Sequence, residues 1–252
     1  GAAPTTQIPH LGFRTTLDAS GDTWTNPADG SVYHFVAGGE YSIGSEAEGA
    51  SSREAPEHTI SVDGFWIQET ETTNAQYARC VDDGACTEPD NDRWQDPDFA
   101  DYPVANVSWE QAMSYTQWLG ARLPTEAEWE VACRGPDHNL YPWGEETPYV
   151  DLANYGDVVE DTMPVGSYPE GVAASGALDM AGNVWEWTSS LDMAYAYDPN
   201  DGREAADADG KRIMRGGSFY YPELFLRCSA RTGAAPTTQI PHLGFRTTLD
   251  GR

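Results

Sequence analysis

The sequence has very little positive charge. It contains 14 Lys and Arg residues against 41 Asp and Glu residues, Lys211 is its single lysine, and its formal net charge is -27. A surface of this sign repels phosphate backbones and anionic membranes, so the composition argues against a nucleic-acid partner. A solvated acidic shell is the ordinary explanation of such a charge, and cation binding is the alternative.

Long apolar runs are also missing. The sequence has no stretch of 18 apolar residues, no signal peptide and no lipidation motif, so we expect no membrane insertion. Any export signal must therefore already have been removed.

Cysteines are few and occur in two settings. Cys80 and Cys86 are close in the sequence, whereas Cys133 and Cys228 are far apart. Four cysteines permit three pairings, and the sequence alone does not choose among them. The spacing is not that of a zinc finger, so metal binding by these thiols is not expected. Two disulfides would place the protein outside the cytosol, and we therefore expect an extracellular or cell-surface protein.

The remaining composition is that of a folded protein rich in turns. The chain has 252 residues, of which 39% are hydrophobic and 12% aromatic, enough for one sizeable core. Its 25 Gly and 17 Pro interrupt the periodic patterns of helices and strands. We therefore expect loops to outweigh regular structure.

Local patterns predict three short helices and several strands. Capping boxes begin two helices, one with Ser108 and Gln111 and the other with Thr125 and Glu128. A further helix is predicted over residues 74–80, and strands over residues 33–44, 58–69, 212–219 and 223–230. The turn-rich residues 19–32 are predicted to be a linker, which leaves residues 33–250 as the domain.

Four motifs lie close together in the last third of the chain. They are Gly182-Asn183-Val184-Trp185-Glu186-Trp187-Thr188, Arg215-Gly216-Gly217-Ser218-Phe219, Leu226-Arg227-Cys228 and Leu243-Gly244-Phe245-Arg246. Together they resemble the formylglycine-generating-enzyme family, over approximately residues 33–250. The resemblance implies a C-type-lectin-like fold, which is a complex, loop-rich α+β architecture with few short helices around small antiparallel sheets.

The same resemblance implies an activity whose ligands are missing here. The family oxidises a sulfatase cysteine with copper held by two cysteines that follow the Gly-Gly-Ser motif. In this chain Tyr221 stands about where the first cysteine is expected, and the second is absent. A cuprous ion needs soft ligands such as thiolates. We therefore expect no catalytic residues and no enzyme, with a copper-dependent formylglycine-generating oxidase with relocated ligands as an alternative.

For the four cysteines, the resemblance implies one long-range disulfide. The family bonds a cysteine after its Glu-Trp-Glu helix to one in the Arg-Cys strand, and Cys133 and Cys228 match those positions. This pairing leaves Cys80 and Cys86 to form a local disulfide.

Calcium is the cofactor that the resemblance implies. Asp179 and Glu186 flank the backbone carbonyls of Gly182 and Val184, and an oxygen-only ligand set of this kind suits a hard cation. Carried over position by position, these four residues are the expected calcium ligands. The alternative is that the two acids are ordinary solvated loop residues.

A second calcium site is expected by the same comparison. It consists of Asn154, the carbonyl of Tyr155, Asp157 and the carbonyl of Val159, followed by Pro164. The match of this segment to the family pattern is looser. Here the alternative is that Asn154 is simply a turn former.

The first 18 residues of the chain occur a second time near its end. Residues 1–18 are identical to residues 233–250, and both contain His-Leu-Gly-Phe-Arg with the alternation of a half-buried strand. In the resembling family this segment is the last core strand, for which a domain has a single place. The repeat indicates a tandem array, donation of the leading strand to a neighbouring subunit, or an artefact. Self-association through residues 1–18 or 233–250 is therefore the expected partnership.

These observations lead to a structural or binding role. We expect a non-catalytic, calcium-stabilised extracellular module that assembles through the duplicated strand. The alternative is a module that binds a protein or a glycan through an aromatic surface, since tyrosine is favoured at contact surfaces. The expected binding residues are Tyr195, Tyr197, Phe219, Tyr220 and Tyr221.

Overall fold

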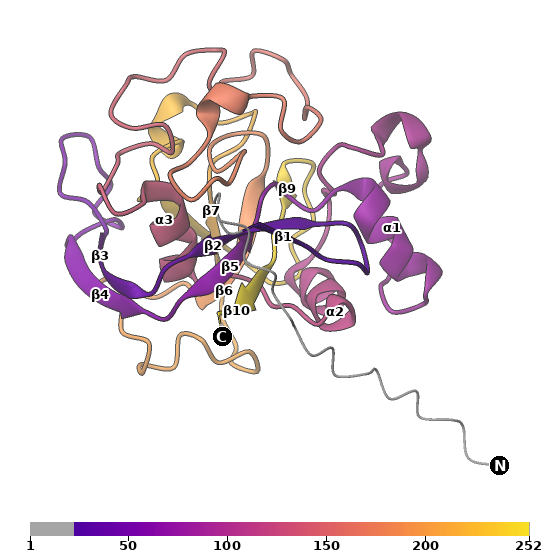
Figure 1. The fold of residues 1–252 in the computed structure, drawn as a ribbon, viewed down its shortest axis with the longest axis horizontal. Helices are drawn as coiled ribbons and strands as arrows, with labels where there is room; N and C mark the ends of the chain where they lie inside the picture. Colours follow the sequence, from indigo (N-terminus) through magenta and orange to yellow (C-terminus); the bar gives the residue numbers. More distant parts are fainter. Residues whose placement is uncertain (1–22, 252) are drawn as a thin grey trace.

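The computed structural model describes residues 23–251, and the first copy of the repeat, residues 1–18, lies outside the described residues. Within the described range, three α-helices and three small sheets are joined by long loops (Figure 1). The expected loop-rich α+β architecture is therefore confirmed.

Two of the sheets are antiparallel. The first has the order β1-β2-β5-β10, with β1 (Thr23–Thr25), β2 (Val32–Val36), β5 (Phe65–Gln68) and β10 (Thr248–Asp250). The second consists of β3 (Gly39–Ile43) paired with β4 (His58–Val62). The two ends of the described chain thus lie at opposite edges of one sheet, β1 at one edge and β10 at the other.

The third sheet carries the sequence motifs. Its order is β8-β7-β6-β9, with β8 (Arg231–Ala234), β7 (Arg212–Arg215), β6 (Trp185–Leu191) and β9 (Leu243–Gly244). The pairing of β6 with β9 is parallel, unlike the other pairings of this sheet. Because β9 belongs to the repeated segment, that segment contributes strands to two different sheets.

Side-chain caps set where the three helices begin. They are α1 (Asn74–Asp82), α2 (Trp109–Leu119) and α3 (Glu126–Arg134). The two predicted capping boxes, at Ser108 and Thr125, are present, and α1 has a third at Thr73. α2 ends at Gly120, whose φ of 74° is a left-handed conformation that glycine adopts without strain. Four short 3-10 helices complete the list, over Arg93–Gln95, Pro97–Phe99, Pro169–Gly171 and Glu223–Phe225.

Several predicted boundaries are wrong. Residues 33–44 and 58–69 each contain two strands, and the strand predicted over residues 212–219 ends at Arg215. Residues 23–32 of the predicted linker form β1 and a turn into β2, because Asn26, Asp29 and Ser31 in that turn are buried and hydrogen-bonded. Asp29, for example, accepts hydrogen bonds from the Ser31 amide and the Tyr115 hydroxyl. Residues 223–230 do not form a strand, because the amides of Leu226 and Ala230 donate to carbonyls three residues earlier and close local turns.

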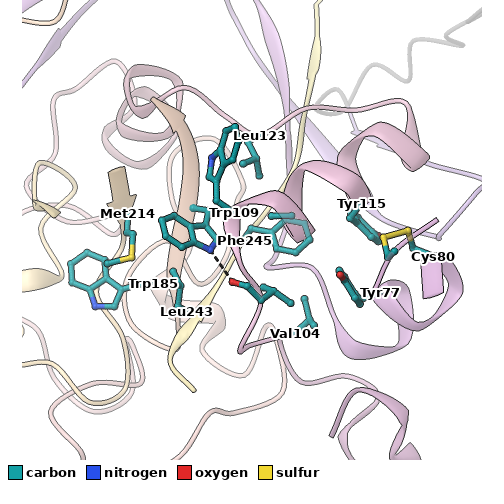
Figure 2. Close-up of a cluster of buried hydrophobic side chains, with 14 of the residues drawn as sticks. Tyr77, Cys80, Val104, Trp109, Tyr115, Leu123, Trp185, Met214, Leu243 and Phe245 are labelled. Carbon is teal, nitrogen blue, oxygen red and sulfur yellow. Dashed lines mark hydrogen bonds between the residues drawn. A yellow bond between two sulfur atoms is a disulfide. The ribbon is translucent and has the colours of Figure 1, made fainter. Parts of the chain in front are cut away.

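The main hydrophobic core joins α1, α2 and the third sheet (Figure 2). The rings of Tyr77 and Tyr115 stack with centroids 5.6 Å apart, and Phe245 packs edge-on to both. Trp185 and Met214 lie at the opposite end of this cluster from Cys80. The core therefore fixes the third sheet, and with it the sequence motifs, against the helices.

Buried ion pairs hold a second part of the interior. Seven arginines are buried: Arg134, Arg203, Arg212, Arg215, Arg227, Arg231 and Arg246. In α3, the fully buried carboxylate of Glu126 lies 3.2 Å from Arg203, 3.3 Å from Arg215 and 2.9 Å from Arg231. Such pairs are stable only when each partner is present, since an unpaired buried charge is costly.

Both expected disulfides are present. Cys80 is bonded to Cys86, and Cys133 is bonded to Cys228. Between residues 23 and 251, no helix has the length and apolar content needed to cross a bilayer.

Candidate functional site

Six side chains form an aromatic face beside the third sheet. We call Trp185, Phe219, Tyr220, Tyr221, Phe225 and His242 the aromatic face. Tyr221 packs edge-on to Trp185 with ring centroids 5.5 Å apart, and Tyr220 stacks on His242 at 5.8 Å. Three of the five predicted binding residues, Phe219, Tyr220 and Tyr221, are thus brought together.

Two buried polar side chains at this face have no hydrogen-bond partner. They are the indole nitrogen of Trp185 and the hydroxyl of Ser218, in residues that are 1% and 0% exposed. Figure 2 shows the Trp185 nitrogen on the side of the ring that faces away from Leu243 and Phe245. Ser218 is tied to the same face because its carbonyl accepts the Tyr221 amide. Leaving a buried donor unpaired costs about 1–3 kcal/mol, so a ligand or water is the expected partner.

His242 supplies the titratable group of the face. Burial lowers the pKa of His242 below its usual value, so the imidazole is neutral at neutral pH and one ring nitrogen can accept a proton. Its carbonyl accepts the Trp185 amide at 2.8 Å, which ties the loop before β9 to β6.

The other two predicted binding residues lie elsewhere. Tyr195 and Tyr197 pack against the second hydrophobic cluster, around α3, rather than the aromatic face. The Tyr195 hydroxyl donates to Glu130 at 3.0 Å, and the Arg231 guanidinium lies 4.2 Å from the ring centre. Burial is the main cause that raises the pKa of Tyr195. These two tyrosines therefore belong to the buried ion-pair network.

A small cavity adjoins the aromatic face through Pro241. Its volume is about 230 Å³, and its wall includes Arg93, Asn106 and Asp161. Arg93 and Asp161 pair through two hydrogen bonds of 2.8 and 2.7 Å. The Asn106 side-chain oxygen is buried without a partner. A cavity of this size fits one side chain or small group better than a whole cofactor.

Copper held by two thiolates does not fit this chain. The sequence has four cysteines, and all four are in the two disulfides. A disulfide sulfur carries no thiolate charge, which is the form that binds the metal.

At the first expected calcium segment, the carboxylates already have partners. Arg246 donates two hydrogen bonds of 2.7 Å to Glu186, and the Trp129 indole donates a third. Asp179 accepts the Gly166 amide at 2.6 Å. No cluster of three or more His, Cys, Asp or Glu arranged to hold a metal occurs within residues 23–251.

A third carboxylate, which the sequence did not point to, lies beside these two. Glu71 is fully buried and accepts hydrogen bonds from the Asn183 side chain and the Val184 amide. Burial, followed by the charges of Asp179 and Glu186, raises the pKa of Glu71 well above its ordinary value. Burial likewise raises the pKa of Asp179 to about 6. Among the described residues, Arg246 is the cation that faces this concentration of negative charge.

The second expected calcium segment has a free oxygen. The side-chain oxygen of Asn154 is buried without a partner, in a residue that is 2% exposed. Asp157 and Tyr155 follow in the same loop, and Val159 is partly exposed at 42%. The Asp157 amide donates to the Phe219 carbonyl, so this loop is joined to the aromatic face. An unpaired carbonyl oxygen is a suitable calcium ligand, and the segment therefore fits a cation better than the first does.

A comparison with protein families establishes the family to which the chain belongs. The sulfatase-modifying factor enzyme 1-like domain matches residues 20–250 of the chain. The chain belongs to this family. The resemblance found in the motifs is therefore confirmed for nearly the whole chain.

Named relatives within the family are enzymes. The chain is 32% identical to the formylglycine-generating enzyme of Streptomyces coelicolor, over 85% of this chain and 88% of that protein. It is 31% identical to the hercynine oxygenase of Mycolicibacterium smegmatis, over 86% of this chain and 60% of that protein. The chain therefore spans little more than half the length of the hercynine oxygenases it matches.

Two solved structures share the fold of this chain. The structure of PvdO from Pseudomonas aeruginosa has a TM-score of 0.76 and 25% identity, covering 91% of this chain and 98% of PvdO. Treponema denticola variable protein 1 has a TM-score of 0.72 and 21% identity, covering 93% of this chain and all of that protein, a likeness that concerns the fold.

These findings correct one expectation. We expected no enzyme because the copper-binding cysteines are missing, but relatives at 30–32% identity over most of the chain are named enzymes. The error was to treat one lost ligand pair as the loss of every activity of a scaffold that hosts several.

Three residues that are central to the candidate site were not predicted from the sequence. His242, Trp185 and Ser218 were visible as letters within motifs, but nothing in their spacing showed that they share one face. Ser218 sits beside two glycines, a setting typical of close packing that gives no sign of an unpaired hydroxyl.

Proposed function

We propose that this family member is an oxidoreductase that uses dioxygen and acts on its substrate at the aromatic face. Its named relatives are a formylglycine-generating enzyme and a hercynine oxygenase, and the second name denotes an oxidation by oxygen. Both relatives cover most of this chain, which supports an activity of the same general class.

The observation that carries the proposal is the pair of unpartnered groups, Trp185 Nε1 and Ser218 Oγ. An indole N–H only donates, and a hydroxyl can donate, so each of the two groups suits an oxygen atom that accepts hydrogen bonds. Donors fixed in a buried site stabilise negative charge that develops on such an oxygen during reaction. Most buried polar side chains in folded proteins have a hydrogen-bond partner, so these two groups are candidates for contact with a ligand.

His242 completes the chemistry that these side chains offer. The neutral imidazole can take a proton from a bound thiol or hydroxyl, and its stacking on Tyr220 holds the ring in place. Because the two donors and the base belong to β6, the Ser218 loop and the loop before β9, substrate binding would engage three separate segments. Copper held by thiolates has no part in this proposal, since all four cysteines are in disulfides.

Oxygen consumption tests this proposal. The full chain is incubated with a cysteine-containing peptide or with hercynine, each with a thiol reductant and separately with copper or iron salts. For the peptide, the cysteine becomes an aldehyde with one oxygen atom from dioxygen, sulfur leaves as hydrogen sulfide, the other oxygen becomes water, and two reductant thiols form a disulfide. Mass spectrometry identifies either product.

Trp185→Phe provides the discriminating variant because it removes the donor and keeps an aromatic ring. Loss of one such donor lowers a rate by about 100-fold or more, while Trp66→Phe in β5, outside the face, should leave the rate unchanged. Absence of oxygen uptake with both substrates and both metals, or equal rates in Trp185→Phe and the wild type, would refute the proposal.

We further propose calcium as a stabilising ligand and an extracellular location. The unpaired Asn154 oxygen supports the first, and the two disulfides support the second, since disulfides persist in oxidising compartments. Calcium should raise the melting temperature of the wild type, and Asn154→Ala should reduce that increase.

A binding role for part of the aromatic face is a second candidate. Tyr220 is 59% exposed and stacks on His242, and an exposed planar ring suits a sugar or an aromatic side chain. An array of glycans and proteins tests it, with Tyr220→Ala as the variant expected to lose binding. Binding that is unchanged by this substitution would exclude Tyr220 as the contact.

A further inference from the structure

The repeated segment is deeply built into the fold. Residues 233–250 contribute the end of β8, all of β9 and all of β10, and so join two sheets. We call the described residues that contact them the docking site. Because residues 1–18 have the same sequence, any contact that a side chain of residues 233–250 makes is chemically available to residues 1–18.

Arg246 is the strongest anchor in the docking site. It is fully buried, donates two hydrogen bonds of 2.7 Å to Glu186, and donates to the carbonyls of Gln68, Glu69 and Leu178. The corresponding residue in the first copy is Arg14.

Neighbouring residues add apolar and polar contacts. Phe245 packs edge-on to Tyr115 with ring centroids 5.3 Å apart, and the Thr247 amide and hydroxyl donate to Gln68 at 3.1 and 2.9 Å. Leu243 is fully buried in the main core. Phe13, Thr15 and Leu11 are the matching residues of the first copy.

Sheet geometry disfavours replacement by the first copy of the same chain. Thr23 is in register with Thr248 across β2 and β5, three strand spacings or about 14 Å away. Asp18 would have to take the place of Asp250, two residues further along, which makes the separation about 16 Å. Five residues reach at most about 18 Å, so the connection would have to run almost straight across the face of the sheet.

We propose that the docking site accepts residues 1–18 from a second copy of this chain. In that arrangement His10 of the second copy takes the position of His242, so the partner supplies one residue of the aromatic face. A reciprocal exchange closes into a twofold dimer. The proposal goes beyond the proposed oxidoreductase and stands without it.

The balance between the two copies depends on concentration. Identical side chains gain the same contacts in the docking site. Residues 233–250 belong to the same chain as that site, so their effective concentration there is in the millimolar range. Residues 1–18 of another chain therefore enter the docking site when the protein is concentrated, or when the contacts of residues 233–250 are weakened. The protein's own segment predominates in dilute solution.

Four full-length chains test the proposal: the wild type, Arg246→Ala, Arg14→Ala and the double variant. Light scattering gives the molar mass and circular dichroism the melting temperature, at two concentrations tenfold apart. At the higher concentration, the Arg246→Ala variant should have twice the monomer molar mass, and its melting temperature should be close to that of the wild type. The double variant should stay monomeric and melt roughly 10 °C or more lower, while Arg14→Ala alone should match the wild type in dilute solution.

Two results would overturn the proposal. One is equal melting temperatures and monomeric masses for Arg246→Ala and the double variant. The other is a rescued melting temperature in a monomeric Arg246→Ala, which would mean exchange within one chain. Thr247→Ala and Thr15→Ala, in the same design, give the answer if Arg246→Ala does not fold. Neither readout depends on oxygen uptake, so the oxidoreductase proposal can fail independently.

Discussion

The two disulfides should differ in what they contribute to stability, and the difference follows from their loops. Cys133 and Cys228 are separated by 95 residues, and Cys80 and Cys86 by 6. In the chain-entropy model the long loop stabilises the fold by about 4.7 kcal/mol and the short one by about 2.2 kcal/mol. The perturbation is to replace both cysteines of one pair by alanine, and then both cysteines of the other.

Thermal unfolding followed by circular dichroism measures the effect. For a protein of this size, about 1 kcal/mol shifts the melting temperature by about 2–4 °C, so the variant without Cys133–Cys228 should melt roughly 5–10 °C below the one without Cys80–Cys86. Oxygen uptake, measured well below both transitions, should persist in both variants if these cysteines are structural. Equal losses of melting temperature, or a larger loss for the short loop, would refute the reasoning.

Three further predictions concern the buried charges and the candidate cation site. Glu126→Ala leaves Arg231 without its carboxylate partner, so unfolding experiments should show a loss of about 3–5 kcal/mol, and Glu110→Ala at the exposed start of α2 should show little. Because the folded-state pKa of Asp179 is raised from 3.8 to about 6, the folded protein binds the proton more tightly. In the absence of calcium, stability should therefore fall by about 3 kcal/mol as the pH rises from about 4 to above 6. Asp179→Asn should reduce this pH dependence and leave the part contributed by Glu71, whose pKa is also raised, and a dependence of unchanged size would assign it to another group. Calorimetric titration with calcium should give a weaker signal for Asn154→Ala than for the wild type, and unchanged binding would place the cation away from that oxygen.

Local chemistry in the sequence predicted the parts of the fold that depend on near neighbours. The capping boxes at Ser108 and Thr125 are hydrogen bonds within four residues, and both are present in the structure. The family resemblance implied the disulfide pairing and the architecture, and both are correct. Residues 223–230 were misread because their alternation suits a strand, whereas their amides bond within turns.

The candidate site was harder to predict because it is made by distant segments. Tyr220 and His242 stack although 22 positions separate them, and Trp185 reaches the same face from β6. Tyr195 looked equivalent to Tyr220 in the sequence, yet its hydroxyl lies against Glu130 and Arg215 in the interior. Residue type indicated an aromatic surface, and tertiary packing decided which rings belong to it.

The burial of charges of both signs has a consequence for how this protein meets other molecules. Seven of the 14 basic residues are buried arginines, and seven acidic residues are buried as well. The net charge of -27 is therefore carried by the rest of the chain, where acidic residues outnumber basic ones 34 to 7. Two copies approaching each other must therefore overcome mutual repulsion, which added salt screens. Cationic substrates and basic peptides should instead be drawn in faster at low ionic strength.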